Sequence, residues 1–248
     1  MTNGKGRARR AAAVIFWVLI WQGLSAIIAK PLLLPAPLDV VRALVRLAVT
    51  AAFWQDTLLT LARVSAGIAC ALVLGVLMAV LCCRFRVIEA LFAPIMTLIK
   101  ATPVASFVVL ALVWLRRDYV PVLISAMMVL PVIWANVSAG IRQTDQGLLE
   151  LARAYSLPRR RLLRHIYVPS VLPHFRAACR ASLGFGWKAG IAAEVLTVPR
   201  HSIGRMIYES KLYLQTTELF AWTLCVILLS LCLEKLVLRL IGGGEKDA

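Results

Sequence analysis

Residues 58–83 read LLTLARVSAGIACALVLGVLMAVLCC, an apolar run that is long enough to cross a lipid bilayer as a helix. A hydrocarbon core about 30 Å thick takes roughly twenty helical residues. Five more runs have a similar length and character, and they cover residues 11–29, 88–115, 119–141, 171–197 and 217–241. The sequence therefore predicts an all-α, polytopic membrane protein with about six transmembrane helices.

The composition points to the same class of protein. The mean hydropathy is +0.83 and only 16% of the residues are charged, which leaves too little polar surface for a water-facing globule. A net charge of +16 on a soluble fold would suggest nucleic acid. In a membrane protein, cationic residues beside apolar segments set the topology and contact anionic lipid. We therefore expect membrane lipid as a partner and no nucleic acid.

Basic residues also orient the predicted helices. The first run follows GKGRARR, which is also how a signal peptide opens, but its apolar part is longer than the usual signal core and has no convincing cleavage site. We interpret it as an uncleaved first helix. Lysine and arginine are more frequent on one side, which indicates that both termini are cytoplasmic. This predicts cytoplasmic tails at residues 1–10 and 242–248, a transmembrane domain at 11–241 and, within it, a cytoplasmic loop at 142–169.

Two segments interrupt the pattern of simple spans. Residues 31–37 hold three prolines, and amphipathic spacing follows them, which suits a helix on the membrane surface. The third run is broken at Ala101-Thr102-Pro103, where proline removes a backbone donor and predicts a kink. Such a break, with Lys100 beside it, can mark a translocation pathway or can be a plain packing kink.

The cytoplasmic loop contains ELARAYSLPRRRLLRHIYVP at residues 150–169, and its pattern predicts a helix, a sharp turn and a second helix. A basic amphipathic segment of this kind can lie on anionic lipid. Ala152 and Ala154 instead favour the close approach of a protein partner, and Glu150 would gain nothing at a membrane surface. We therefore expect a cytoplasmic protein to dock here.

These residues resemble the EAA motif of ABC importer permeases. In that motif Glu-Ala-Ala is followed after three residues by glycine and, nine residues later, by Ile-x-Leu-Pro. This sequence has Leu151 at the second place and Ser156 in place of the glycine, and Val168 replaces the leucine. Glycine commonly adopts the left-handed conformation at a helix end, so serine there is expected to be strained by about 1 kcal/mol unless the turn is reshaped with the help of Pro158.

Two more motifs extend the resemblance to most of residues 31–241. LPAPLDV at residues 34–40 and GWKAGIAAEVL at residues 186–196 are similar to segments of the nitrate, sulfonate and taurine branch of these permeases. The resemblance implies a type I ABC importer permease-like fold in the plasma membrane of a prokaryote. It also implies a second permease copy, expected to form a homodimer, and an extracytoplasmic substrate-binding protein.

The resemblance further implies that the loop couples the protein to cytoplasmic ABC ATPase subunits. The coupling residues that it assigns are Glu150, Ala152, Ala154, Ser156, Leu157, Pro158, Arg159, Ile166 and Pro169. The chain has no GxxxxGK[ST] motif that could cradle the phosphates of ATP, so we expect ATP to be bound by the partner subunit and no cofactor or catalytic site in this chain. The six cysteines and three histidines show no spacing of metal ligands, and no metal site is predicted.

Polar residues within the spans are the candidates for a translocation pathway, because a charge at mid-bilayer costs about 2.5–3.5 kcal/mol and is expected to face protein or water. The candidates are Lys100, Thr102, Ser106, Asn136, Lys188 and Glu194. The two lysines would favour an anion, the three uncharged residues can equally form interhelical hydrogen bonds, and Glu194 can instead anchor its helix. Lys188 and Glu194 lie on different helix faces, so each is expected to need its own partner.

Two other classes of function remain open at this point. An integral membrane enzyme would need clustered catalytic side chains near one face of the membrane, and the sequence shows no such grouping. A self-sufficient secondary transporter would more often show two repeated halves with matching broken helices. The substrate is not determined by the sequence, because related permeases serve nitrate, sulfonates and taurine as well as uncharged or cationic vitamin precursors.

Overall fold

The computed structural model describes the backbone of residues 3–242 and the side chains of residues 9, 12–237 and 239. It contains helices and no strands within that part of the chain, which confirms the all-α prediction. The elements are α1 (Asn3–Ile28), α2 (Pro37–Ala48), α3 (Ala51–Arg84), α4 (Arg86–Ala101), α5 (Val104–Trp114), α6 (Val120–Arg142), α7 (Gln146–Ala154), α8 (Arg159–Leu162), the π-helix η1 (Leu163–Tyr167), α9 (Val168–Thr197), α10 (Ile203–Leu212) and α11 (Thr216–Gly242).

Helices occupy all six predicted apolar runs, but not all of them qualify as membrane spans by length and composition. Three helices do, namely α3, α6 and α11 as far as Val237, and the bent pair of α4 and α5 is a fourth if it is one span. The apolar part of α1 is shorter, at Ala12–Ile28. The total of six spans therefore stays a prediction.

The two ends of the chain were predicted to be cytoplasmic tails, and their location stays a prediction. α1 already begins at Asn3, so most of the predicted tail at residues 1–10 is helical and continues into the first apolar run. At the other end, α11 reaches Gly242, and the rest of the predicted tail, residues 243–248, lies outside the described residues.

The core is formed by α3, α6 and α9, in which α6 packs extensively against both of the others and α3 and α9 touch over a shorter region. Glycines allow the close contact. A Cβ atom on Gly67 would lie 2.3 Å from the carbonyl oxygen of Val122, and one on Gly190 would lie 2.4 Å from the hydroxyl of Ser125. Two backbones can therefore approach at distances that a larger residue would prevent.

The predicted break in the third run is present and is sharper than a kink. α4 ends at Ala101, Thr102 is extended, and α5 begins after Pro103, so that the two helices are bent by 111° relative to each other. The cause is local, because proline cannot continue the hydrogen-bond ladder and it disfavours the helical conformation of the residue before it.

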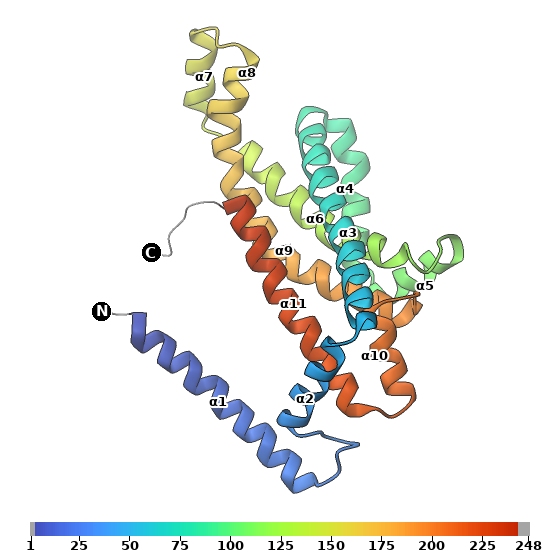
Figure 1. The fold of residues 1–248 in the computed structure, drawn as a ribbon. Coiled ribbons are helices and arrows are strands. Elements are labelled where there is room, and N and C mark those ends of the chain that lie inside the picture. The colour runs from blue at the N-terminus through green and yellow to red at the C-terminus, as the bar shows by residue number, and fades with distance from the viewer. Residues whose placement is uncertain (1–2, 243–248) are drawn as a thin grey trace.

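Short helices lie at both ends of this core, as Figure 1 shows. α7 and α8 project at one end, whereas α2 and α10 lie at the other. The helix predicted after the prolines at residues 31–37 is α2, with Pro37 in its first turn. Its buried residues Val40 and Ala43 pack against Ala221 of α11, and the position on the membrane surface stays a prediction.

Candidate functional site

The loop at residues 142–169 folds as a helix, a turn and a second helix, as predicted, and we call α7, the turn and α8 the hairpin. α7 begins after Asp145, whose carboxylate accepts hydrogen bonds from the amides of Gly147 at 2.7 Å and Leu148 at 3.4 Å. These bonds satisfy donors that a helix start leaves free. Asp145 therefore fixes where the hairpin begins, a role that the sequence reasoning did not assign to it.

The turn contains the serine that stands in place of the motif glycine. Ser156 has φ 47°, which is the left-handed conformation that favours glycine. Its amide donates to the carbonyl of Arg153 at 3.0 Å, and the amide of Leu157 donates to the carbonyl of Ala152 at 2.9 Å. This is the Schellman pattern of a helix end. The turn has therefore kept the geometry of the glycine form, and the strain expected for serine is present.

Replacing this serine tests that strain. Ser156→Gly is expected to stabilise the hairpin by up to about 1 kcal/mol, because the relief of the left-handed strain exceeds the extra backbone entropy of glycine in the unfolded chain. Amide hydrogen exchange of α7 should slow by up to about fivefold. Ser170→Gly, in the first turn of α9, is the control and should be destabilising by about 1 kcal/mol or more, because glycine is the poorer helix former and the hydrogen bond from the Ser170 hydroxyl to the Ile166 carbonyl is lost. Faster exchange in Ser156→Gly would contradict the interpretation.

The second arm of the hairpin passes into a core helix without a loop. α8 is followed directly by η1 and α9, and the amide of Val168 donates to the carbonyl of Leu163, five residues before it. Pro169 has no amide hydrogen to offer the preceding turn, so the regular ladder is interrupted here. The motif residue Ile166 is buried in this wider turn, whereas Pro169 is exposed.

The exposed arc of α7 is the part of the hairpin that a partner can reach. At 100° per residue, Leu148, Leu151 and Tyr155 fall on one side of α7, and Glu150 and Ala154 continue the same arc. All five are exposed, Tyr155 to 75% and Leu151 to 54%. We call these five residues the outer face of α7, and it combines large apolar side chains with one carboxylate.

Ala152 faces the second arm of the hairpin. It is only 5% exposed, and together with Leu149, Leu157, Leu162 and Tyr167 it lines a small space between the two arms of the hairpin. Its small side chain allows the two arms of the hairpin to approach each other closely. The predicted contact of a partner with Ala152 stays a prediction, and Ala154 is the alanine of the pair that is exposed.

The six pathway candidates do not form one cluster in this chain. Three of them surround the break between α4 and α5: Lys100 and Ser106 are exposed, and Thr102 donates its hydroxyl to the carbonyl of Leu98 at 2.8 Å. Asn136 lies on α6 and donates to its own helix at the carbonyl of Val132, 2.9 Å away. Lys188 is exposed on α9. The two lysines therefore reach the outside of the chain from different helices.

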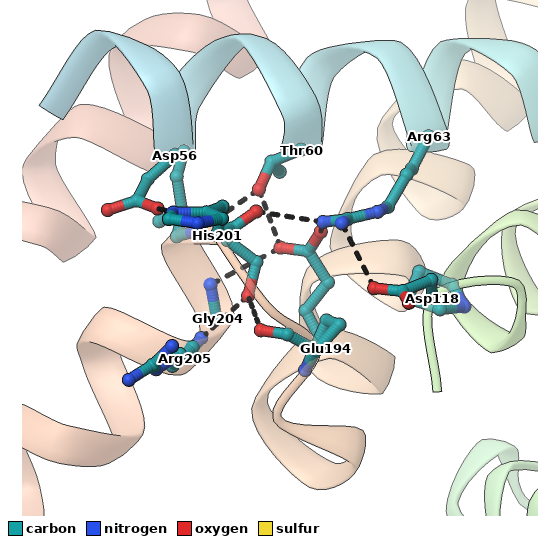
Figure 2. A network of polar contacts seen from close by, with 12 residues as sticks. Asp56, Thr60, Arg63, Asp118, Glu194, His201, Gly204 and Arg205 are labelled. Carbon is teal, nitrogen blue, oxygen red and sulfur yellow. Dashed lines mark hydrogen bonds and ion pairs between the residues drawn. The ribbon is translucent and has the colours of Figure 1, made fainter. Parts of the chain in front are cut away.

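Glu194, the sixth candidate, lies in a buried polar network at the end of the core away from the hairpin (Figure 2). Its carboxylate is fully buried and accepts hydrogen bonds from the hydroxyl of Thr60 at 2.8 Å and the amide of Gly204 at 3.2 Å. The guanidinium of Arg63 lies 3.5 Å from its other oxygen. The partners that the sequence analysis expected for Glu194 are thus on α3 and at the start of α10.

Arg63 is the centre of this network (Figure 2). Besides Glu194, its guanidinium donates to the carbonyls of Arg200 and His201, both at 2.9 Å, and forms an ion pair with Asp118 at 3.1 Å. One side chain therefore joins α3 and α9 to the connectors before α6 and before α10. The sequence reasoning missed Arg63, although it is the only charged residue between positions 57 and 83 and a lone charge in an apolar run is a usable signal.

The sequence of this chain matches one protein family. The family model described as "Binding-protein-dependent transport system inner membrane component" matches residues 71–241. That range contains the break, the hairpin and Glu194. Thr60 and Arg63 lie before it.

Curated relatives cover most of the chain at low identity. A Haemophilus influenzae protein named "Probable ABC transporter permease protein" is 25% identical over 87% of this chain and 88% of the relative. The taurine transport system permease protein TauC of Escherichia coli is 22% identical over 86% of this chain and 80% of the relative. The bicarbonate transport system permease protein CmpB of Synechococcus elongatus is 28% identical over 64% of this chain and 57% of the relative.

Proposed function

The chain belongs to the family of binding-protein-dependent transport system inner membrane components, and from this premise we propose how it works as an ABC transporter permease. Two copies form the translocation pathway for a small solute. Cytoplasmic ATPase subunits, which bind the ATP, hold the hairpin, and an extracytoplasmic binding protein delivers the solute to the opposite end. Both termini lie in the cytoplasm, and the protein resides in the plasma membrane of a prokaryote.

The outer face of α7 is the observation that carries the coupling proposal. It exposes Leu148, Leu151 and Tyr155 at the end of a projecting hairpin, beside the carboxylate of Glu150. When a groove of a partner covers exposed apolar side chains, the free energy of binding becomes more favourable. A few such side chains usually provide most of the binding energy. Helical connection of the hairpin to α9 would then pass a movement of the ATPase to the core helices.

Copurification tests the coupling proposal. Glu150→Lys and Leu151→Asp are each expected to reduce the ATPase activity that copurifies with the permease by at least about tenfold, because each disrupts a central contact. Membrane insertion should be unchanged. Asp39→Lys reverses an exposed carboxylate on α2, at the other end of the molecule, and should retain the ATPase. Equal retention in all three variants would refute the role of the outer face of α7.

The two exposed lysines support the further proposal that the solute is an anion. Bicarbonate, named for one of the relatives, is an anion, and taurine, named for another, carries a negative sulfonate beside a positive ammonium group. Lys100 and Lys188 are exposed in the single chain, and a lysine at bilayer depth is costly unless water or protein covers it. A water-filled pathway between two copies would meet that requirement. For Glu194, the buried network supports an anchoring role instead.

Uptake measurements test the lysines. The double variant Lys100→Gln, Lys188→Gln is expected to lower the uptake of radiolabelled taurine or bicarbonate, whichever the binding protein retains, by at least about tenfold, because the cationic walls that concentrate an anion are lost. Lys211→Gln, exposed on α10, is the control and should transport normally. Normal uptake by the double variant would remove both lysines from the pathway.

A further inference from the structure

A cavity lies at the hairpin end of the core, where α3 and α6 end and η1 passes into α9. Its volume is about 590 Å³, which is within the range of sites that bind small molecules. Val76 and Val80 of α3 form one wall, Ile141 of α6 contributes to a second, and Leu163 and Phe175 belong to a third. The walls are almost entirely apolar, so water is a poor occupant.

One charged residue borders this cavity, and it lies at one end. Arg84 is the last residue of α3, while Val76 lies eight residues earlier, about 12 Å away along the helix. That length is comparable with one leaflet of a hydrocarbon core about 30 Å thick. The cavity therefore matches an amphiphilic molecule in length and in polarity. Its apolar part is about as long as one leaflet is thick, and Arg84 provides a positive charge at one end.

The charge of Arg84 is available to an external anion. Among the residues whose side chains the structure describes, no carboxylate forms an ion pair with it, and its guanidinium lies 5.5 Å from the centroid of the Phe85 ring. The neighbouring Arg142, in contrast, is paired with Glu89. The lining contains no acidic residue. An anionic group beside Arg84 would therefore be attracted by its guanidinium, and the described lining residues would not repel it.

We propose that this cavity binds one acyl chain of an anionic phospholipid, with the lipid phosphate against Arg84. Apolar walls favour the chain by roughly 0.8 kcal/mol for each buried methylene group, and arginine is well suited to phosphate. Because Leu163 and Tyr167 are the ends of η1, the bound lipid contacts the root of the hairpin.

Native mass spectrometry of the purified full-length chain tests this site, with phosphatidylglycerol and phosphatidylcholine of identical acyl chains as probes. Arg84→Gln is expected to lower retention of phosphatidylglycerol about fivefold and to leave phosphatidylcholine unchanged. Arg86→Gln, an exposed neighbour that is not in the lining, is the matched control and should retain phosphatidylglycerol. Equal losses in the two variants would overturn the proposal, since they would indicate general surface attraction.

Two more measurements address the cavity itself. Val80→Trp fills it from a half-exposed position and is expected to abolish retention of both lipids. Cys83 lines the cavity, so phosphatidylglycerol should slow its reaction with a maleimide, whereas Cys70, exposed on the same helix outside the lining, should react as before. Retention of phosphatidylglycerol by Val80→Trp would overturn the proposal. So would protection of Cys83 only after the second copy or the ATPase is added, because protein would then cover the cavity.

Discussion

Arg63→Ala is expected to lower the free energy of unfolding by about 3–5 kcal/mol, because it leaves the fully buried carboxylate of Glu194 without a cation. The same substitution also removes the hydrogen-bond donor of the carbonyls of Arg200 and His201, which lowers the free energy of unfolding further. Unfolding of the purified protein in detergent, followed by its thermal midpoint, measures the effect. Arg42→Ala, which removes an exposed arginine paired with Asp39, is the control and should cost less than about 0.5 kcal/mol.

A double-mutant cycle separates this ion pair from a simple loss of packing. Glu194→Gln removes the buried negative charge while keeping the size of the side chain, so Arg63→Ala should be less harmful in that background. We expect the two free-energy changes to fall short of additivity by at least about 1 kcal/mol. Strict additivity would show that Arg63 and Glu194 do not depend on each other.

Gly204→Ala is the second substitution with a large expected effect, about 3 kcal/mol or more of lost stability. A Cβ atom at this position would lie 2.3 Å from the Cβ of Glu194 and 2.6 Å from two backbone atoms of α9. Backbone atoms of a packed helix cannot move aside locally, so α10 would have to leave α9 and break the hydrogen bond from the Gly204 amide to Glu194.

Gly184→Ala is the matched control for this prediction. No atom outside the helix lies within 4 Å of the position of its Cβ, and alanine is the better helix former by about 1 kcal/mol. The control should therefore be neutral or slightly stabilising in the same thermal assay. If both alanine variants behaved alike, the close approach of α10 to α9 would not exist in solution.

The hairpin and the break could be predicted because their signals are local. Three consecutive residues, Ser156 to Pro158, determine the turn, and Pro103 acts on its own backbone and on Thr102. The bend of 111° could not be predicted in the same way, because proline removes a hydrogen bond but the packing of α5 on its neighbours decides its direction. The inward position of Ala152 likewise depends on how the second arm folds back.

The partners of Glu194 could not be predicted from the sequence, for a different reason. Thr60 and Glu194 are 134 positions apart, so no periodic pattern relates them, and the pairing appears only when α3 and α9 lie side by side. The sequence could indicate that a buried carboxylate needs a partner, and Arg63, as a lone charge in an apolar run, was available as a candidate. The choice between Arg63 and the nearer Lys188 required the three-dimensional arrangement.

The unbroken passage from α8 through η1 into α9 has a mechanical consequence. Residues 159–197 form one continuous helical segment without an intervening loop, which at about 1.5 Å per residue is roughly 58 Å long and exceeds the thickness of a membrane with its headgroup layers, about 40–45 Å. Because no flexible loop separates the hairpin from α9, a displacement of the hairpin cannot be absorbed between them. The movement must then either tilt the far end, where Arg63 joins the connectors, or be taken up within the segment, at the wider turn of η1 or at Pro173, where proline interrupts the hydrogen-bond ladder of α9.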